Sequence, residues 1–187
     1  MNYLILVKHS LPSVIEDQPA REWNLSDEGR TRAQILAEKL KPYQPEVIIS
    51  SIEPKAVQTA EVVAHFLGLQ MQVYENFHEH DRSKTAYLAR DVFESRVREF
   101  FDKPNELIFG NETANQSHQR FCDAVDSVLN QHKNQTVLIV AHGTVISLFV
   151  SRLTGTPDFS LWKELGLPSF VVFDLYSKAL ITRENIV

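Results

Sequence analysis

Two spacings of apolar residues alternate along the chain. Short, mainly apolar runs lie at residues 3–7, 47–49, 71–74 and 136–141, and two more follow near the end at 170–175 and 179–182. The first run stops abruptly at Lys8, His9 and Ser10. Apolar runs without alternation are typical of strands in a parallel sheet, because helices cover both of its faces. The pattern therefore predicts buried strands at these positions.

Between the runs, apolar residues recur every three to four positions, which is the spacing of amphipathic helices. Helices are expected at 26–40, 54–67, 85–101, around 121–129 and at 145–153. Ser26 is suited to cap the first helix and Pro54 to begin the second, while Gly68 and Gly155 suit helix ends. The last two apolar runs, about a turn at residues 176–177, predict a hairpin of two strands.

The order of strands and helices predicts an α/β fold with three layers, α/β/α. Its central sheet should be mostly parallel, with right-handed crossovers and helices on both faces. The length of 187 residues, without an internal repeat or linker, predicts a single domain over residues 1–187. Residues 11–24 are polar and contain proline, which predicts a loop. A long loop directly after a buried strand is often functional.

Composition narrows the classes of partner. The formal net charge of −5 argues against a general nucleic-acid or membrane-surface binder, although a local basic pocket remains open. The lone cysteine, Cys122, excludes an intrachain disulfide and is compatible with a reducing cytosol. The first apolar run is too short for a transmembrane helix and lacks a cleavage site, so we expect a cytoplasmic protein.

Three ionisable side chains follow the ends of predicted strands. His9 and His142 each come after a buried run, and Lys55 lies at the start of the helix that follows a third run. In open α/β sheets, ligands bind beyond the carboxyl ends of the strands. If the three strands are parallel neighbours, their side chains meet at one edge of the sheet and can surround one small anion.

Five segments in order carry a resemblance to a known family. They are LILVKHS, LSDEGRTRAQILAEKL, ISSIEPKAVQTAEVVA, FHEHDRS and LIVAHG. They resemble the successive motifs of the histidine phosphatase superfamily, also called phosphoglycerate mutase-like. That pattern has Arg-His-Gly after the first strand, Leu-Thr-x-x-Gly at a helix start, Ser-Ser-x-x-x-Arg-Ala-x-Gln-Thr-Ala, an acidic residue in the middle and a late His-Gly. The match covers about the first four fifths of the chain, and its order makes it specific.

The resemblance implies a role for each matching residue. His9 would be the nucleophile that becomes a phosphohistidine, and Lys8, Lys55 and His142 would surround the phosphoryl group. Glu79 would protonate the leaving oxygen and later activate water. General chemistry supports these roles, because phosphoryl transfer needs positive donors around the equatorial oxygens, and an alcohol leaving group needs a proton.

Further candidates are implied for substrate binding, and the sequence also departs from the family pattern. Ser10, Arg21, Arg82 and Gly143 are the candidate substrate-binding residues. Lysines replace both expected arginines, and Ser10 replaces a glycine. Because arginine holds phosphate with a planar fork and lysine with a point charge, the geometry of the site changes while its charge is kept. The loop has Pro12 and Ile15 where Thr/Ser and Asn are expected, and Ser10, Ser13, Arg21 or Asn24 could substitute.

Several alternatives stay open from the residues alone. Glu75, Glu79 and Asp81 are all candidates for the acid, and only the resemblance favours Glu79. His78 and His80 have the spacing of metal ligands in an extended segment, which makes a metal hydrolase a less favoured alternative. A salt bridge with a neighbouring acid is an alternative for Arg82, and a solvated loop charge is one for Arg21.

The favoured function is a phosphatase that needs neither metal nor cofactor and acts on a small phosphorylated substrate. A phosphoglycerate mutase is the nearest rival, but the middle region is short for one. A phospholigand-binding protein without turnover is the rival from another class, because of the two lysines. The apolar C-terminal hairpin makes a homodimer possible.

Overall fold

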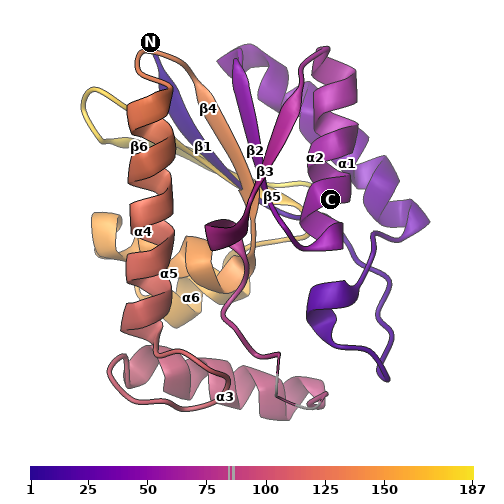
Figure 1. Ribbon diagram of the computed structural model, residues 1–187, viewed down its shortest axis with the longest axis vertical. Coiled ribbons are helices and arrows are strands. Elements are labelled where there is room, and N and C mark those ends of the chain that lie inside the picture. The colour runs from indigo at the N-terminus through magenta and orange to yellow at the C-terminus, as the bar shows by residue number, and fades with distance from the viewer. Residues whose placement is uncertain (84, 86) are drawn as a thin grey trace.

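The computed structural model describes residues 1–83, 85 and 87–187 (Figure 1). Its centre is a mixed six-stranded sheet in the order β3-β2-β4-β1-β5-β6. The strands are β1 (Tyr3–Lys8), β2 (Val47–Ser51), β3 (Met71–Tyr74), β4 (Val137–Ala141), β5 (Ser169–Asp174) and β6 (Leu180–Asn185). β3, β2, β4 and β1 run parallel, and β5 and β6 complete the sheet as antiparallel strands. The predicted mostly parallel sheet is confirmed.

Helices cover both faces of the sheet, as predicted. They are α1 (Asp27–Leu40), α2 (Pro54–Leu67), α3 (Arg90–Asp102), α4 (Ala114–Gln131), α5 (Gly143–Thr154) and α6 (Asp158–Glu164). Residues of α1 and α2 share one core cluster with one face of the sheet, and residues of α4, α5 and α6 share another with the opposite face. In Figure 1, α3 lies below these layers, beyond the carboxyl ends of the parallel strands.

The first strand shows why its sequence is apolar without alternation. Ile5 and Val7 point into the core beneath α1 and α2, whereas Leu4 and Leu6 point into the core beneath α4 and α5. All four side chains are buried. Burying a side chain of this size stabilises the fold by about 1.5–3 kcal/mol, so a polar residue at any of these positions would be costly. The run is therefore apolar on both sides.

Local signals fix several boundaries. The Ser26 hydroxyl accepts a hydrogen bond from the Gly29 N–H and caps α1, and Gly68 ends α2 with a φ of 69°. Gly29 also permits a close approach of the loop after β1, because a Cβ there would lie 2.1 Å from the Leu11 carbonyl oxygen. That carbonyl accepts the Ser26 N–H at 3.0 Å and ties the loop to the start of α1.

Other boundaries differ from the prediction. The helix expected over 85–101 begins only at Arg90; residues 85 and 87–89 precede it, and residue 86 lies outside the described residues. Leu88 lines a cavity instead of joining a helical stripe. Helix α6 was not predicted, because seven residues are too short to show a helical period. Strand β6 extends to Asn185, beyond the predicted end at residue 182.

The topology brings the predicted strand ends together. β4 lies between β1 and β2, and Lys8 is in register with Ala141. The His9 N–H continues this ladder by donating to the Ala141 carbonyl at 3.0 Å. Helices α2 and α5 begin just beyond β2 and β4, so their first residues lie at the same edge. Among the helices described, none combines the length and the apolar character needed to cross a membrane.

Candidate active site

His9 and His142 face one another at the carboxyl edge of the sheet. Their ring centroids are 5.2 Å apart, with the planes at 60°. The Nδ1 atom of His9 lies 2.7 Å from the Ser10 carbonyl, which can only accept, so Nδ1 carries the proton and Nε2 holds a free electron pair. Burial, and then the nearby charges of His142 and Lys55, hold the pKa of His9 well below its usual value. The ring is therefore neutral at pH 7.

His142 is fully buried behind this edge. Its Nε2 lies 2.7 Å from the Ser51 hydroxyl, and its Nδ1 has no hydrogen-bond partner among the described residues. Burial and the charge of Lys55 hold the pKa of His142 well below its usual value, against the opposing effect of Glu79. Nδ1 is thus the ring nitrogen left to meet a ligand.

Both lysines reach the site by different routes. Lys55 is buried and donates to the Ala20 carbonyl at 2.7 Å, which ties α2 to the loop after β1. Lys8 donates to the Leu165 carbonyl at 2.7 Å. Burial lowers the pKa of Lys8 to about 8, although the Glu79 charge acts in the other direction. Gly143 makes room for this side chain, because a Cβ there would lie 3.2 Å from the Lys8 Cε.

Glu79 lies against the start of α5. Its Oε2 accepts the Thr144 N–H at 3.1 Å, and its Oε1 accepts the His80 N–H at 2.8 Å. Burial alone would raise the pKa of this carboxyl, but the charges of His142 and Arg82 and the two N–H groups together hold the pKa of Glu79 below its usual value. Without a ligand, Glu79 is therefore ionised at pH 7.

The other two acids considered from the sequence are placed differently. The Asp81 carboxylate accepts hydrogen bonds from the Ser83 N–H and the Asn111 side chain. These hydrogen bonds outweigh the effect of burial and lower the pKa of Asp81 to about 2. Glu75 is exposed in a short 3₁₀ turn, Glu75–Phe77. Of the three acids, Glu79 is the one whose carboxylate touches the start of α5.

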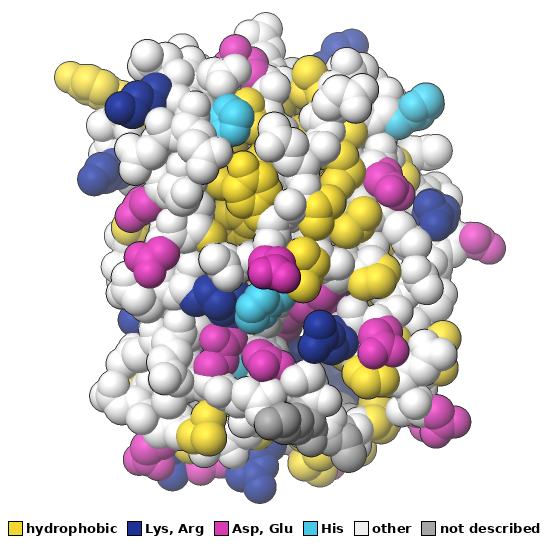
Figure 2. All heavy atoms as spheres, viewed as in Figure 1, with side chains coloured by type: hydrophobic (Ala, Val, Ile, Leu, Met, Phe, Trp, Pro, Cys, Tyr) yellow, Lys and Arg dark blue, Asp and Glu magenta, His cyan; other side chains and the backbone are white. Residues whose placement is uncertain are grey.

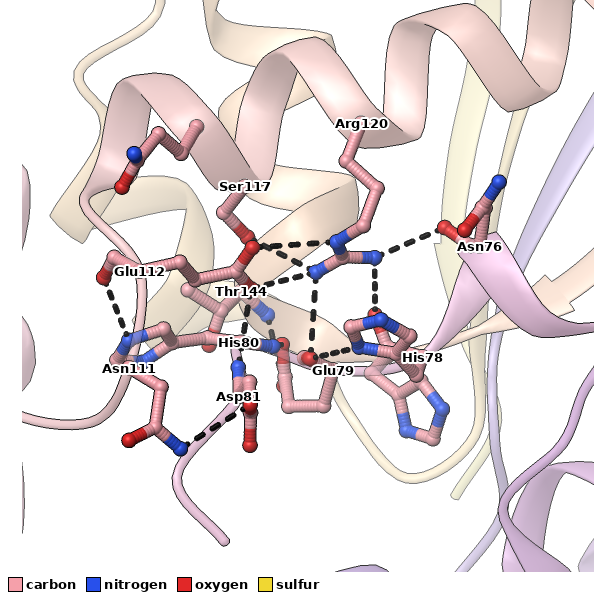
Figure 3. Close-up of polar contacts among 12 residues, drawn as sticks. Asn76, His78, Glu79, His80, Asp81, Asn111, Glu112, Ser117, Arg120 and Thr144 are labelled. Carbon is pink, nitrogen blue, oxygen red and sulfur yellow. Dashed lines mark hydrogen bonds and ion pairs between the residues drawn. The ribbon is translucent and has the colours of Figure 1, made fainter. Parts of the chain in front are cut away.

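Arg120 of α4 holds the segment that carries Glu79 (Figure 3). Its guanidinium donates to the carbonyls of Asn76 at 2.8 Å and His78 at 3.0 Å, with a longer contact of 3.4 Å to that of Glu79. The same group forms a two-pronged pair with Glu112, at 2.6 and 3.2 Å. Arginine suits this role because its donors are fixed in one plane. We call residues 75–83 the acid segment.

The histidines beside Glu79 have separate surroundings. The His80 ring is buried and stacks on Phe100, with centroids 4.1 Å apart, and its Nε2 lies 3.2 Å from the Glu112 carbonyl. His78 turns its Nδ1 to the Glu79 carbonyl at 2.8 Å. In the described residues, no group of three or more potential metal ligands clusters. The geometry thus gives His80 a packing role.

A cavity of about 870 Å³ opens at this edge, and in Figure 2 acidic, basic and histidine side chains gather on the lower half of the face. His9, Lys8, Lys55, Glu79, Arg21, Arg82 and Gly143 all line it. His142 and Ser10 do not, and Ser10 is fully buried, with its N–H donating to Thr59. The Arg82 guanidinium lies 4.6 Å from the Phe93 ring centroid, over its face.

Glu53, which comes just before α2, is a further residue of the site that was not predicted from the sequence. This buried carboxylate accepts the Glu79 N–H at 2.9 Å through Oε1, which also lies 3.7 Å from the His142 Nε2. Its Oε2 forms an ion pair with Lys55. An acid at a helix start is common because it suits the helix dipole, so nothing in the residue pattern distinguishes Glu53 as functional.

Comparison with known proteins adds the family. The sequence profile described as "Histidine phosphatase superfamily (branch 1)" matches residues 4–181. The chain belongs to the histidine phosphatase superfamily. The match confirms the resemblance found in the sequence motifs and extends it across the C-terminal hairpin.

Individual members of the histidine phosphatase superfamily share only low sequence identity with this chain. An uncharacterized phosphatase, PhoE, of Bacillus subtilis is 25% identical over 131 residues, which are 70% of this chain and 65% of PhoE, just under two thirds of that relative. Phosphoserine phosphatase 1 of Hydrogenobacter thermophilus is 26% identical over 167 residues, 85% of this chain and 79% of the relative. A mutant phosphoserine phosphatase of Entamoeba histolytica, solved with phosphoserine, aligns with a TM-score of 0.80 at 17% identity, covering 98% of this chain and 96% of that one. It shows the shared fold.

Proposed function

We propose that this protein hydrolyses a small phosphate monoester through a phosphohistidine on His9. One observation carries the proposal: the His9 ring has one nitrogen fixed by a carbonyl and the other free, on a cavity wall, 5.2 Å from a second histidine. A neutral imidazole held in this way can attack phosphorus in line and divide one difficult step into two. The relatives that act on phosphate esters support the same reaction class.

In the first step, the His9 Nε2 forms a bond to phosphorus while the ester P–O bond breaks. Lys8, Lys55 and His142 stabilise the charge on the transferred group. Glu79 gives its proton to the leaving alcohol oxygen. The carboxyl is ionised in the free protein, but a bound phosphate dianion raises its pKa by repulsion, which prepares it as an acid. In the second step, Glu79 takes a proton from water as that water attacks the phosphohistidine and releases phosphate.

The test is chemical trapping of the intermediate. The protein is mixed with p-nitrophenyl phosphate, phosphoserine and 3-phosphoglycerate, quenched within milliseconds and analysed for phosphate that is labile in acid and stable in base. We expect such phosphate on His9, and His9→Ala should lower turnover by about 10⁴-fold. His65→Ala, which removes an exposed histidine of α2, is the matched control and should leave turnover unchanged.

Three outcomes would contradict the proposal. Tight phosphate binding without release of alcohol from any ester would favour the phospholigand-binding alternative. Interconversion of phosphoglycerates with little phosphate release would favour a mutase. Phosphate on a residue other than His9 would overturn the assignment of the nucleophile.

A further inference from the structure

The Glu53 carboxylate contacts side chains that a bound phosphoryl group would also need. Lys55 and His142 are two of the groups placed around the transferred phosphoryl group, and both lie against this one carboxylate. The contact to Lys55 is an ion pair between side chains that are each only 7% exposed. At such sites, water screens charge poorly, so the two charges interact more strongly than an exposed pair would.

The position of Glu53 in the cavity wall is a second observation, independent of its ion pair. Glu53 lines the cavity, whereas His142 does not. The Glu53 Oε1 atom lies 3.7 Å from the His142 Nε2, the nitrogen that also contacts Ser51, so Nδ1 of that ring is not engaged by Glu53. An anion that enters the cavity therefore meets a wall that carries both Lys55 and the carboxylate paired with it.

The local charge count points in the same direction. Lys8, Lys55 and Arg82 bring positive charges to the site, and Glu53 and Glu79 bring negative ones, so Glu53 lowers the net positive charge that a phosphate meets. A phosphate dianion placed within about 4 Å of an ionised carboxylate is strongly repelled at low effective dielectric. Either the carboxylate leaves Lys55 when phosphate binds, or the affinity for phosphate is reduced.

We propose that Glu53 is an internal anion that competes with the substrate's phosphoryl group for Lys55, and so sets the affinity of the site for phosphate. The inference rests on the proposed function, because it takes Lys55 as a phosphate ligand. In chemical terms, the carboxylate holds Lys55 in a paired state while the site is free. Substrate binding exchanges one anion for another at Lys55, and phosphate release is helped by the returning carboxylate.

Glu53→Gln tests this directly. The amide keeps an oxygen to accept the Glu79 N–H and has nearly the same shape, but it has lost the charge that holds Lys55. Titration calorimetry with inorganic phosphate at pH 7.5 gives the dissociation constant without need for turnover. We expect Glu53→Gln to bind phosphate about tenfold or more tightly than the unmodified protein. In steady-state assays, product inhibition by phosphate should strengthen by a similar factor.

Two controls separate competition from a general change of charge. Glu75→Gln removes an exposed carboxylate from the same cavity wall, away from Lys55, and should change the dissociation constant by less than about twofold. On a Lys55→Gln background, Glu53→Gln should give a much smaller gain, because the cation for which the two anions compete is absent. Glu53→Ala, with folding checked by its unfolding midpoint, should bind phosphate more tightly in the same way.

Unchanged or weaker binding by both Glu53 variants would overturn the inference, since it would mean that the carboxylate supports Lys55 in its phosphate-binding position. That result is distinct from failure of the proposed function. Absence of ester hydrolysis by the unmodified protein would remove the enzymatic proposal, whereas the ratio of the two phosphate dissociation constants reports on Glu53 alone.

Discussion

Two regions build the candidate site, and they are held in place by different forces. The two histidines follow strands at the centre of the sheet, where the backbone ladder continues through the His9 N–H. The acid segment crosses from the sheet edge to α3, and it is held by side chains from elsewhere, chiefly Arg120 and Glu53. A strand end is positioned by many backbone bonds, whereas the acid segment is held by two buried rings, Phe77 and His80, and by a few side-chain hydrogen bonds.

The comparison suggests that nucleophilic attack and proton donation can be separated by mutation. Changes in the acid segment should impair proton transfer and leave the phosphorylation of His9 possible. Changes near the strand ends should affect both steps. The following predictions are designed to test that separation.

Glu79→Gln should give the largest effect within the acid segment. Loss of the proton donor is expected to lower kcat for phosphoserine by about 10²–10³-fold, because an alkoxide is a poor leaving group. For p-nitrophenyl phosphate, whose leaving group needs no proton, the first step should stay fast and the phosphohistidine should accumulate. Rapid-quench measurement of the burst for the two esters checks this.

Glu75→Gln and Asp81→Asn are the matched controls for Glu79→Gln. Each removes a carboxylate within the same segment, and neither carboxylate touches the start of α5. We expect both to retain turnover within a few-fold. A large loss in either control, with Glu79→Gln active on phosphoserine, would move the acid to that residue.

The contrast between the two regions also explains what the sequence could predict. The runs at residues 3–7 and 136–141 predict buried strands because both faces are covered, and the histidines then follow from chain direction alone. Arg120 lies on α4 among polar residues that alternate with its apolar stripe, and nothing in that spacing distinguishes it from a solvated charge. Its partners, the carbonyls of residues 76 and 78, carry no signal in the sequence at all.

Glu53 and Ser51 were missed for a related reason. Both are short-range neighbours of predicted elements, but their contacts to His142 arise only when β2 and β4 are adjacent. Residue type likewise could not show which of Glu75, Glu79 and Asp81 is the proton donor, because that depends on which carboxylate reaches α5. Motif resemblance supplied this assignment, and the geometry is consistent with it.

Arg120→Ala should have a smaller effect on activity than Glu79→Gln. Loss of the guanidinium frees the carbonyls of the acid segment and leaves Glu112 without its partner. Because a misplacement of about 1 Å can cost up to 10²-fold, we expect kcat for phosphoserine to fall about 10- to 100-fold. The free energy of unfolding should fall by about 2 kcal/mol.

A purely structural role would lower the rates for all esters together. If Arg120 positions Glu79, the loss for p-nitrophenyl phosphate in the first step should be several-fold smaller than the loss for phosphoserine. Arg120→Lys, which keeps the charge but cannot reach the same set of acceptors, should fall between the two. Arg96→Ala removes an exposed ion pair of α3 and should change neither activity nor stability measurably.

Lys8 gives the mildest test at neutral pH, and it concerns the strand-end region. Burial lowers its pKa to about 8, so this lysine loses its charge as pH rises through about 8. The free protein then has one cation fewer for phosphate, and kcat/KM should fall about tenfold per pH unit above that value. Lys8→Arg should move this alkaline limb upward, because arginine keeps its proton, with only a few-fold change at pH 7. Lys133→Arg, an exposed replacement of the same kind, should leave the limb in place.

The same ionisation must appear in stability. Between pH 8 and the ordinary lysine value of 10.5, the unfolded chain holds a proton on Lys8 that the folded chain has released, so the Lys8 contribution to stability rises with pH in this window. Lys8→Arg abolishes that rise. His9 and His142 act at acidic pH. Their pKa values lie well below 6.5, so the unfolded state takes up protons first and stability falls as pH drops below about 6.5.

An alkaline limb of the kcat/KM profile that is identical in Lys8→Arg and the unmodified protein would show that another group controls phosphate binding at high pH. That result would remove Lys8 from the set of phosphate ligands.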